Sequence, residues 1–301
     1  MEEKKCLIGA QEAKARVDVF LKNKEPDFSR TSIQDLILNG KVFVNGAKVK
    51  PHYKLKLNDE LRWEIAPVEE CGLAPEDISF EVVFEDKDII VLNKPSGLVV
   101  HPGAGNQTHT LVNALLYHTK ELSTISPERP GIVHRLDKET SGIMVVAKNN
   151  HTHLELAKQF KKHSIERRYI ALVEGQVAFD EGVVDVPIKR HIMDRKKMSV
   201  SFTEEAKEAH TVYKVLKRYP AFTAVELFPQ TGRTHQLRVH LSYLGHPILG
   251  DMTYGRKKNF PRLALHAKDL GFTHPGTSEF VKFSSPLPPE MKEAMKGLRV
   301  E

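Results

Sequence analysis

A polar bend between two apolar segments is the most informative feature of the chain. It reads Gly131-Ile132-Val133-His134-Arg135-Leu136-Asp137-Lys138-Glu139-Thr140-Ser141-Gly142 and runs into the apolar segment Ile143-Met144-Val145-Val146-Ala147. The first apolar residues are enough for a short strand, and the charged and small residues after them predict a tight turn. The last segment predicts a strand with no polar face, which is buried on both sides.

Asp137 lies in this bend between two cations, Arg135 and Lys138. Neighbouring positive charge keeps a carboxylate ionised. An ionised carboxylate can accept a proton, act as a nucleophile or form a salt bridge. The same spacing is typical of a solvated surface turn, so the residues alone leave both interpretations open.

The pattern from His134 to Asp137, followed by Thr140-Ser141-Gly142, resembles the H-R-L-D-x-x-T-S-G motif of the RluA/RluD family of RNA pseudouridine synthases. These enzymes break the N1–C1′ bond of a uridine, turn the base and rejoin it through C5. The resemblance implies that Asp137 is the nucleophile, either at C1′ or at C6 of the ring. It also implies that Arg135 fills the gap left when the target base flips out of its stack. Nothing is oxidised and no group is transferred, so no cofactor is implied.

Further blocks extend the resemblance over nearly the whole chain. Asn93-Lys94-Pro95-Ser96-Gly97 resembles a largely structural block beside the family's active site. Residues 165–175 resemble the block that carries the active-site tyrosine, which maps onto Tyr169. The resemblance places the Tyr169 ring against the target base and its hydroxyl in position for proton chemistry.

Residues 231–240 resemble the family's T-G-R-T-H-Q-L-R-V-H block. The arginine that pairs with the catalytic aspartate in the family maps onto Arg238. Arg233 is expected to contact a phosphate or a helix terminus. Leu237, Leu241 and Leu244 share one helical face, so the block should continue as a helix that ends at Gly245.

Residues 1–65 are similar to the S4 RNA-binding domain. Val17, Phe20 and Leu21 predict one helix, and Ser29 begins a second helix that ends at Gly40. Lys41–Gly46 alternates into an Asn-Gly hairpin turn. The resemblance makes the basic residues of this module candidate phosphate contacts, chiefly Arg16, Arg30 and Lys41.

The predicted fold class is α+β, with two domains. The S4 module, residues 1–65, is followed by a linker at 66–79, which contains four acidic residues and no Lys or Arg. Residues 80–301 form the expected pseudouridine synthase catalytic domain, on a mixed, mainly antiparallel sheet with flanking helices. Two β-rich runs broken at Asp86 predict a hairpin at the start of this domain.

The densest basic segment lies within residues 187–198 of the catalytic domain. A charge run is usually a solvated face, but in a nucleic-acid enzyme such a loop supplies a non-specific grip on phosphates. Its candidate RNA-binding residues are Lys189, Arg190, Arg195, Lys196 and Lys197.

Composition restricts the class of protein. The chain has 301 residues, a formal net charge of +6 and two cysteines far apart in sequence, Cys6 and Cys71. These values indicate a soluble protein of a reducing compartment, the cytoplasm, and they permit nucleic-acid binding. No signal region and no membrane span are predicted. The histidines lack metal-ligand spacing, so no metal is expected. We expect a monomer whose partner is RNA, most simply large-subunit ribosomal RNA.

Two other functions remain open from the sequence. A non-catalytic RNA-binding assembly factor would need the basic surfaces but not Asp137, Tyr169 and Arg238 together. A hydrolase with an aspartate nucleophile would need a second carboxylate or base near Asp137, for which Glu139 is the only near candidate. The same reaction on transfer RNA is a third possibility, because close relatives share these motifs.

Overall fold

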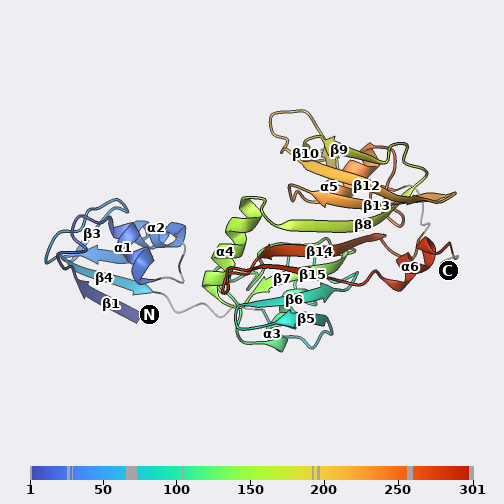
Figure 1. Cartoon of the computed structure of the whole chain (residues 1–301). Coiled ribbons are helices and arrows are strands. Elements are labelled where there is room, and N and C mark those ends of the chain that lie inside the picture. The colour runs from blue at the N-terminus through green and yellow to red at the C-terminus, as the bar shows by residue number, and fades with distance from the viewer. Residues whose placement is uncertain are drawn as a thin grey trace.

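The computed structural model describes residues 2–25, 28, 30–65, 73–103, 105–191, 193–194, 197–255 and 260–297. Within these ranges the chain forms a small N-terminal module and a larger domain built around one long sheet (Figure 1). The expected α+β class is confirmed: the sheets are mainly antiparallel and the helices are few. None of these helices has the length and apolar character needed to cross a bilayer.

The N-terminal module packs two helices against a four-stranded antiparallel sheet. Its strands follow the order β1-β4-β2-β3. The elements are β1 (Glu2–Leu7), α1 (Val17–Lys24), α2 (Arg30–Leu38), β2 (Val42–Val44), β3 (Ala47–Lys48) and β4 (Glu60–Ile65). Asn45 and Gly46 have φ values of 51° and 77°, as the predicted Asn-Gly hairpin turn requires. The expected cap at Ser29 lies outside the described residues.

This module has a hydrophobic core of its own. Both helices contribute buried side chains to it, including Val17, Leu21, Ile33 and Ile37, and they pack on the strand residue Trp63. All members of this cluster come from residues 6–63. The module therefore meets the main physical requirement for an independent folding unit.

The larger domain is organised around a nine-stranded sheet. Its order is β5-β6-β7-β14-β8-β13-β12-β9, with β15 paired to β14. Its strands are β5 (Glu81–Glu85), β6 (Ile89–Lys94), β7 (Ser141–Ala147), β8 (Glu166–Glu174), β9 (Glu181–Asp185), β12 (His210–Arg218), β13 (Phe222–Pro229), β14 (Leu265–Thr273) and β15 (Phe280–Ser284). A separate hairpin is formed by β10 (Ile188–Arg190) and β11 (Met198–Val200).

Four helices flank this sheet: α3 (Leu111–His118), α4 (Asn150–Lys161), α5 (Gln236–Tyr243) and α6 (Pro289–Met295). Thr110 caps α3 and forms a capping box with Asn113. The predicted hairpin at Asp86 is confirmed as the antiparallel pair β5–β6. The apolar residues before the bend do not form a strand, however: Ile132 makes a single bridge to Val146.

The predicted apolar strand is confirmed as β7, whose seven residues are all buried. It pairs with β6 on one side and is parallel to β14 on the other, where Ser141 and Gly142 face His266 and Ala267. Gly142 has φ +119°, and a Cβ there would lie 2.2 Å from the carbonyl oxygen of Ala267. Only glycine allows the two backbones this approach, so the bend is held close to β14.

Two hydrophobic clusters fill the domain, one on each side of this junction. The first joins β6 and β7 to α3 and α4, and the second joins β8, β12 and β13 to α5 and α6. Tyr169 of β8 packs against both clusters. The bend that carries Asp137 and the ring of Tyr169 thus meet where the two halves of the domain join.

Candidate active site

A cavity of about 100 Å³ opens at this junction. The bend, strand β8 and the segment that leads into α5 all contribute to its wall. Asp137, Tyr169 and Arg238, the three predicted catalytic residues, line it together with Arg135 and Arg233. The fold therefore brings to one place side chains that are about 100 residues apart in the chain.

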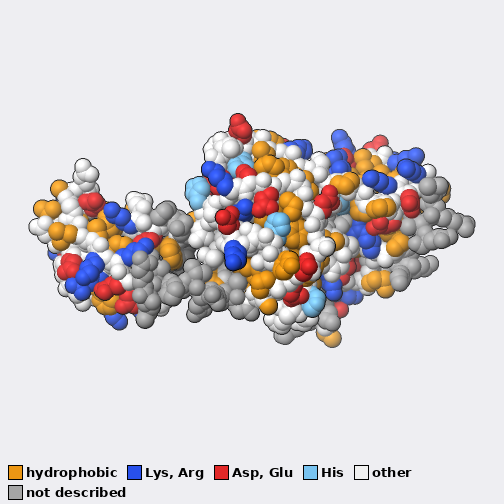
Figure 2. Space-filling model, turned by 90° about the horizontal axis from the view of Figure 1, so that it is seen from below, with side chains coloured by type: hydrophobic (Ala, Val, Ile, Leu, Met, Phe, Trp, Pro, Cys, Tyr) orange, Lys and Arg blue, Asp and Glu red, His pale blue; other side chains and the backbone are white. Residues whose placement is uncertain are grey.

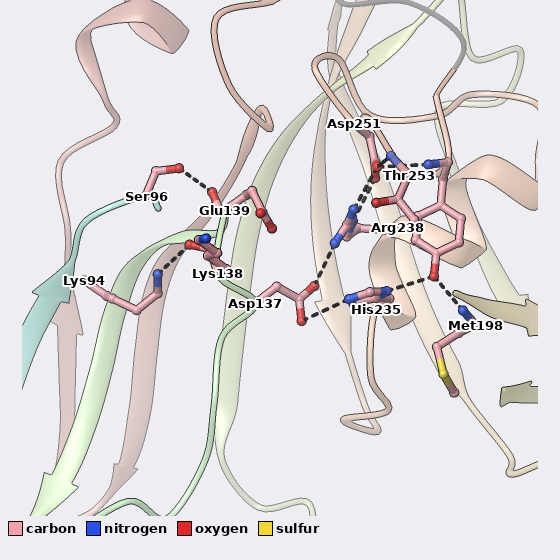
Figure 3. A network of polar contacts seen from close by, with 11 residues as sticks. Lys94, Ser96, Asp137, Lys138, Glu139, Met198, His235, Arg238, Asp251 and Thr253 are labelled. Atoms are coloured by element: carbon pink, nitrogen blue, oxygen red, sulfur yellow. Dashed lines mark hydrogen bonds and ion pairs between the residues drawn. The ribbon is translucent and has the colours of Figure 1, made fainter. Parts of the chain in front are cut away.

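The Asp137 carboxylate lies between two nitrogen groups without a hydrogen bond to either (Figure 3). Its Oδ2 is 3.6 Å from Arg238 Nη1, and its Oδ1 is 4.0 Å from His235 Nε2. The side chain is only 17% exposed. Its oxygens face positive or proton-bearing groups at a distance that leaves them free to react.

Arg238 contacts two carboxylates, and the closer one was not predicted. Its Nε and Nη2 donate to Asp251 Oδ2 and Oδ1, both at 2.8 Å, so the expected partner Asp137 lies second. Burial alone would lower the pKa of Arg238, but the hydrogen bonds and charge of Asp251, aided by Asp137, raise it. Arg238 is therefore a permanent, fixed cation beside Asp137.

Side chains behind the bend fix its backbone. The Lys94 ammonium is fully buried and donates to the carbonyl oxygens of Pro95, Leu98 and Lys138 at 2.8, 2.8 and 3.0 Å. Ser96 Oγ donates to the carbonyl of Glu139 at 2.6 Å. Figure 3 shows the contacts of Lys94 with Lys138 and of Ser96 with Glu139, on the side of the bend opposite His235 and Arg238. The structural role expected of this block thus has a mechanism: it holds the two carbonyls that follow Asp137.

Tyr169 lies half-buried in the cavity wall. Burial raises the pKa of its phenol; Arg167 opposes this effect and Asp137 adds to it. The hydroxyl is therefore neutral at physiological pH and can donate a hydrogen bond, but it is a poor proton acceptor. Tyr169 can therefore donate a hydrogen bond or stack on the target base, but it is not expected to accept a proton.

Two histidines of the site were not singled out from the sequence. His235 Nδ1 is 2.8 Å from Tyr254 Oη, and its ring edge faces Asp137. His134 stacks on Phe160, and its Nε2 accepts the N–H of Val145 at 3.1 Å. Both lie inside motifs that were recognised, but a motif does not show which of its members contact one another.

Comparisons with known proteins agree with this geometry. A family model described as RNA pseudouridylate synthase matches residues 88–243, and an S4 domain model matches residues 15–61. The chain belongs to the RNA pseudouridine synthase family. The recognition made from the motifs, and with it the isomerase class, is confirmed.

Several relatives align along almost the whole of this pseudouridine synthase. It is 44% identical over 297 residues to an uncharacterised RNA pseudouridine synthase of Bacillus subtilis, covering 97% of each chain. It is 43% identical to ribosomal large subunit pseudouridine synthase D of Zymomonas mobilis, covering 95% of this chain and 94% of the relative. The solved human RNA pseudouridylate synthase domain containing 4 superposes with a TM-score of 0.58 at 31% identity, over 73% of this chain and 94% of that one.

The candidate RNA-binding cations of this pseudouridine synthase lie at the cavity, in the β10–β11 hairpin and in the S4 module. Arg135 and Arg233 are exposed at the cavity, where Arg233 Nε also donates to the carbonyl of Glu208. Lys189 and Arg190 are in β10 and Lys197 directly precedes β11. Arg195, Lys196 and the Arg30 side chain lie outside the described residues. On the face shown in Figure 2, cationic and acidic groups are intermixed.

The module cations are less available than the sequence suggested. Arg16 makes two 3.0 Å hydrogen bonds to Asp18, and Lys41 donates to Glu64 at 2.9 Å. Both side chains remain more than 40% exposed, so they can still meet a phosphate. Lys41 would do so at the expense of a surface ion pair, which is worth little, whereas Arg16 would give up hydrogen bonds to the fully buried Asp18, which costs more.

One group in the described part of the chain has the composition of a metal site. Asp86, Asp88 and His274 hold their ligand atoms within 4.8 Å of one another. His274 Nδ1, however, accepts the backbone N–H groups of Gly276 and Thr277 at 3.1 and 3.2 Å. The ring proton is then on Nε2, which faces Asp86 at 3.0 Å. A neutral imidazole beside a carboxylate accounts for the group, and the expected lack of a metal stays a prediction.

Proposed function

We propose that this enzyme converts uridines of large-subunit ribosomal RNA to pseudouridine, with Asp137 as the nucleophile. The observation that carries the proposal is the Asp137 carboxylate, held in the cavity between Arg238 and His235 without a hydrogen bond to either. Relatives named ribosomal large subunit pseudouridine synthase D, at 37–43% identity, support the substrate. We expect a cytoplasmic monomer.

In the proposed reaction, Asp137 attacks the flipped uridine at C1′ or at C6. The N1–C1′ bond breaks, the base turns, a C5–C1′ bond forms, and the bond to Asp137 breaks, which returns the carboxylate. The proton on C5 is lost and N1 gains one, so atoms and charge balance without a cofactor. The fixed Arg238 cation lies 3.6 Å from the Asp137 carboxylate and helps to hold it in the cavity before attack. The neutral Tyr169 phenol offers a ring and a donor to the base.

Base flipping needs a group to occupy the vacated stack. Arg135 is exposed, lies two residues before Asp137 and lines the mouth of the cavity. Its planar guanidinium can stack on bases and meet phosphates. We therefore propose that Arg135 fills the gap, which offsets an unstacking cost of a few kcal/mol.

The test is tritium release from RNA labelled with 5-tritiated uridine, because loss of the C5 proton accompanies each turnover. Wild type, Asp137→Ala and Glu139→Gln are compared on large-subunit ribosomal RNA and on bulk transfer RNA. Glu139 is the neighbouring, exposed carboxylate and serves as the matched control. We expect release from ribosomal RNA by wild type and Glu139→Gln, and none by Asp137→Ala.

The other outcomes are equally informative. Release from transfer RNA alone contradicts the proposed substrate but not the chemistry. Release by Asp137→Ala contradicts the nucleophile. Tight binding of both RNA pools without release contradicts the enzyme activity on them and favours an assembly factor.

A further inference from the structure

His235 makes specific contacts at both edges of its ring, and the reaction as described leaves it without a role. The residue immediately precedes α5 and has a left-handed backbone, with φ 54°. Its side chain is 19% exposed in the cavity wall. One ring nitrogen faces Tyr254. The other faces Asp137 (Figure 3).

The hydrogen bonds around Tyr254 define the tautomer of His235. Tyr254 Oη accepts the backbone N–H of Met198 at 2.8 Å. Its own proton can be donated to His235 Nδ1, also at 2.8 Å, which makes Nδ1 the acceptor. In this tautomer the ring proton lies on Nε2, which points at Asp137 Oδ1.

Burial favours this neutral form, and the charges that face His235 act in both directions. They are Asp137, Arg238, Asp251 and Glu139, with the Tyr254 hydroxyl on the far edge. Burial lowers the pKa of His235; Asp137 opposes this effect and Arg238 reinforces it. The ring consequently offers Asp137 a neutral N–H donor and not a second full positive charge.

We propose that His235 is a positioning residue for the Asp137 carboxylate, an inference that rests on the proposed function. Nε2–H of His235 approaches Oδ1 while Nη1 of Arg238 approaches Oδ2. Two donors at two different oxygens define the plane of a carboxylate, which a single ion pair does not. The present 4.0 Å separation shortens when RNA fills the cavity, as hydrogen bonds in unliganded sites commonly do.

The same chain of contacts reaches the basic hairpin. Met198 begins β11, and its N–H holds Tyr254. The hairpin also carries Lys189, Arg190 and Lys197, which are candidate phosphate contacts. Tyr254 thus joins a segment proposed to grip RNA to the histidine that orients Asp137.

The kinetic test uses His235→Ala, His235→Gln and Tyr254→Phe. Single-turnover tritium release at saturating ribosomal RNA reports the chemical step, and filter binding reports affinity. We expect His235→Ala to slow release by about 10- to 100-fold, as for a hydrogen bond to a charged group. Its RNA affinity should stay within about twofold of wild type. The Gln amide can donate where Nε2 did, so His235→Gln should recover at least about half of the loss on a logarithmic scale.

Tyr254→Phe is expected to slow release by about 3- to 10-fold, as for the loss of a neutral hydrogen bond. A matched control is His163→Ala, since His163 also has a left-handed backbone, with φ 56°, but is exposed after α4. Both alanine variants bear the same backbone strain. His163→Ala should release tritium at the wild-type rate.

The tautomer is measured independently by nitrogen NMR of protein labelled in its histidine rings, with the His235 signals assigned by their absence from His235→Gln. We expect a protonated Nε2 and an unprotonated Nδ1 at neutral pH, and loss of this single tautomer in Tyr254→Phe. A protonated Nδ1 overturns the inference. The kinetic test overturns it if His235→Ala releases tritium as fast as wild type, or if this variant is impaired only in RNA affinity. It is also overturned if His235→Gln is no faster than His235→Ala. A wild type that releases no tritium contradicts the proposed function instead, and the NMR measurement, which needs no substrate, still decides the tautomer.

Discussion

Arg238 is shared between a structural carboxylate and a reactive one. Its two hydrogen bonds go to the fully buried Asp251, which also accepts the backbone N–H groups of Thr253 and Tyr254. The remaining nitrogen, Nη1, faces Asp137. Asp251 thus orients the guanidinium so that its free nitrogen can interact with Asp137.

This arrangement predicts different effects of one and two substitutions. Arg238→Met leaves Asp251 as a buried carboxylate without its cation, which should lower the free energy of unfolding by about 3–5 kcal/mol. Arg238→Met combined with Asp251→Asn should regain most of that stability and still release no tritium. Urea denaturation of the three proteins measures the difference. Equal stability of the single and double variants would contradict the shared role.

A second prediction concerns the stability of the protein at low pH. Burial, with a smaller contribution from Arg167, lowers the pKa of His134 to about 3. The unfolded chain binds a proton at this residue near pH 6.5, while the folded chain stays neutral down to about pH 3. Stability from this group is therefore present above pH 6.5 and falls with pH, by about 2 kcal/mol at pH 5.

His134→Gln is the matched variant, because its amide oxygen can still accept the Val145 N–H but does not titrate. Between pH 7 and pH 5 the wild type should lose about 2 kcal/mol more stability in urea than this variant. Other buried histidines, such as His153 and His266, titrate in both proteins and cancel in the comparison. A parallel loss in the two proteins would show that His134 does not titrate as described.

At the scale of single residues, the sequence predicts which side chains belong to the site better than it predicts which of them contact one another. Asp137, Tyr169 and Arg238 were chosen from separate motifs, and the structure places them around one cavity. Asp251 and His235 were not chosen, because their importance comes from hydrogen bonds to Arg238 and Tyr254 that no spacing encodes. Which residues surround a group depends on the packed fold, and a linear motif does not contain it.

Among the elements, the parallel contact of β7 and β14 is the most restrictive. Gly142→Ala would bring a methyl group to 2.2 Å from the Ala267 carbonyl oxygen in a backbone conformation that already favours glycine. We expect a loss of more than about 3 kcal/mol, or an insoluble protein, since backbone cannot yield as a flexible side chain does.

Gly97→Ala is the control for Gly142→Ala. Gly97 also has positive φ, +88°, but a Cβ there would meet nothing within 4 Å. Backbone strain alone should cost about 1 kcal/mol. Thermal unfolding of the two variants separates strain from collision, and equal melting temperatures would argue against the close approach of β7 and β14.

Elements with strong local signals were predicted and others were missed. The hairpin turn at Asn45 and the hairpin at Asp86 have short-range signatures, and both are present. Strand β1 was missed because Glu2–Leu7 is mostly charged and pairs through its backbone at the sheet edge. Its partner β4 has buried Leu61 and Trp63 at alternate positions, a period of two that could have been recognised.

On the scale of the whole molecule, three large clusters of apolar residues underlie two functional regions, and a fourth, small cluster packs the β10–β11 hairpin against α5. One cluster belongs to the S4 module, and two meet at the candidate active site. The sequence predicted two domains from composition and motifs. It did not predict that the larger domain has two main hydrophobic cores. That division depends on the order of the strands in the sheet, which places Tyr169 where it packs on both cores.

RNA binding should depend more on the basic hairpin than on charge in general. We expect the triple variant Lys189→Gln, Arg190→Gln and Lys197→Gln to flatten the slope of log affinity against log salt by about 2 units, at about 0.7 per single-strand phosphate contact. The matched control neutralises three cations on and after α4, Lys158, Lys161 and Lys162. Its slope should stay close to that of wild type. Filter binding over a salt series measures both, and equal slopes for the two triple variants would assign the effect to net charge.

The burial of Lys94 also has a chemical consequence. Burial lowers the pKa of Lys94 to about 7, but the amine is held by three carbonyl oxygens and has no exposed surface, so it has no path to an acylating reagent. Acetic anhydride should therefore modify the exposed Lys138 and leave Lys94 untouched as long as the bend is closed. The rate of Lys94 acylation, measured by mass spectrometry, would then report how often the bend opens. The amine becomes reactive only in molecules in which Asp137 has left its place.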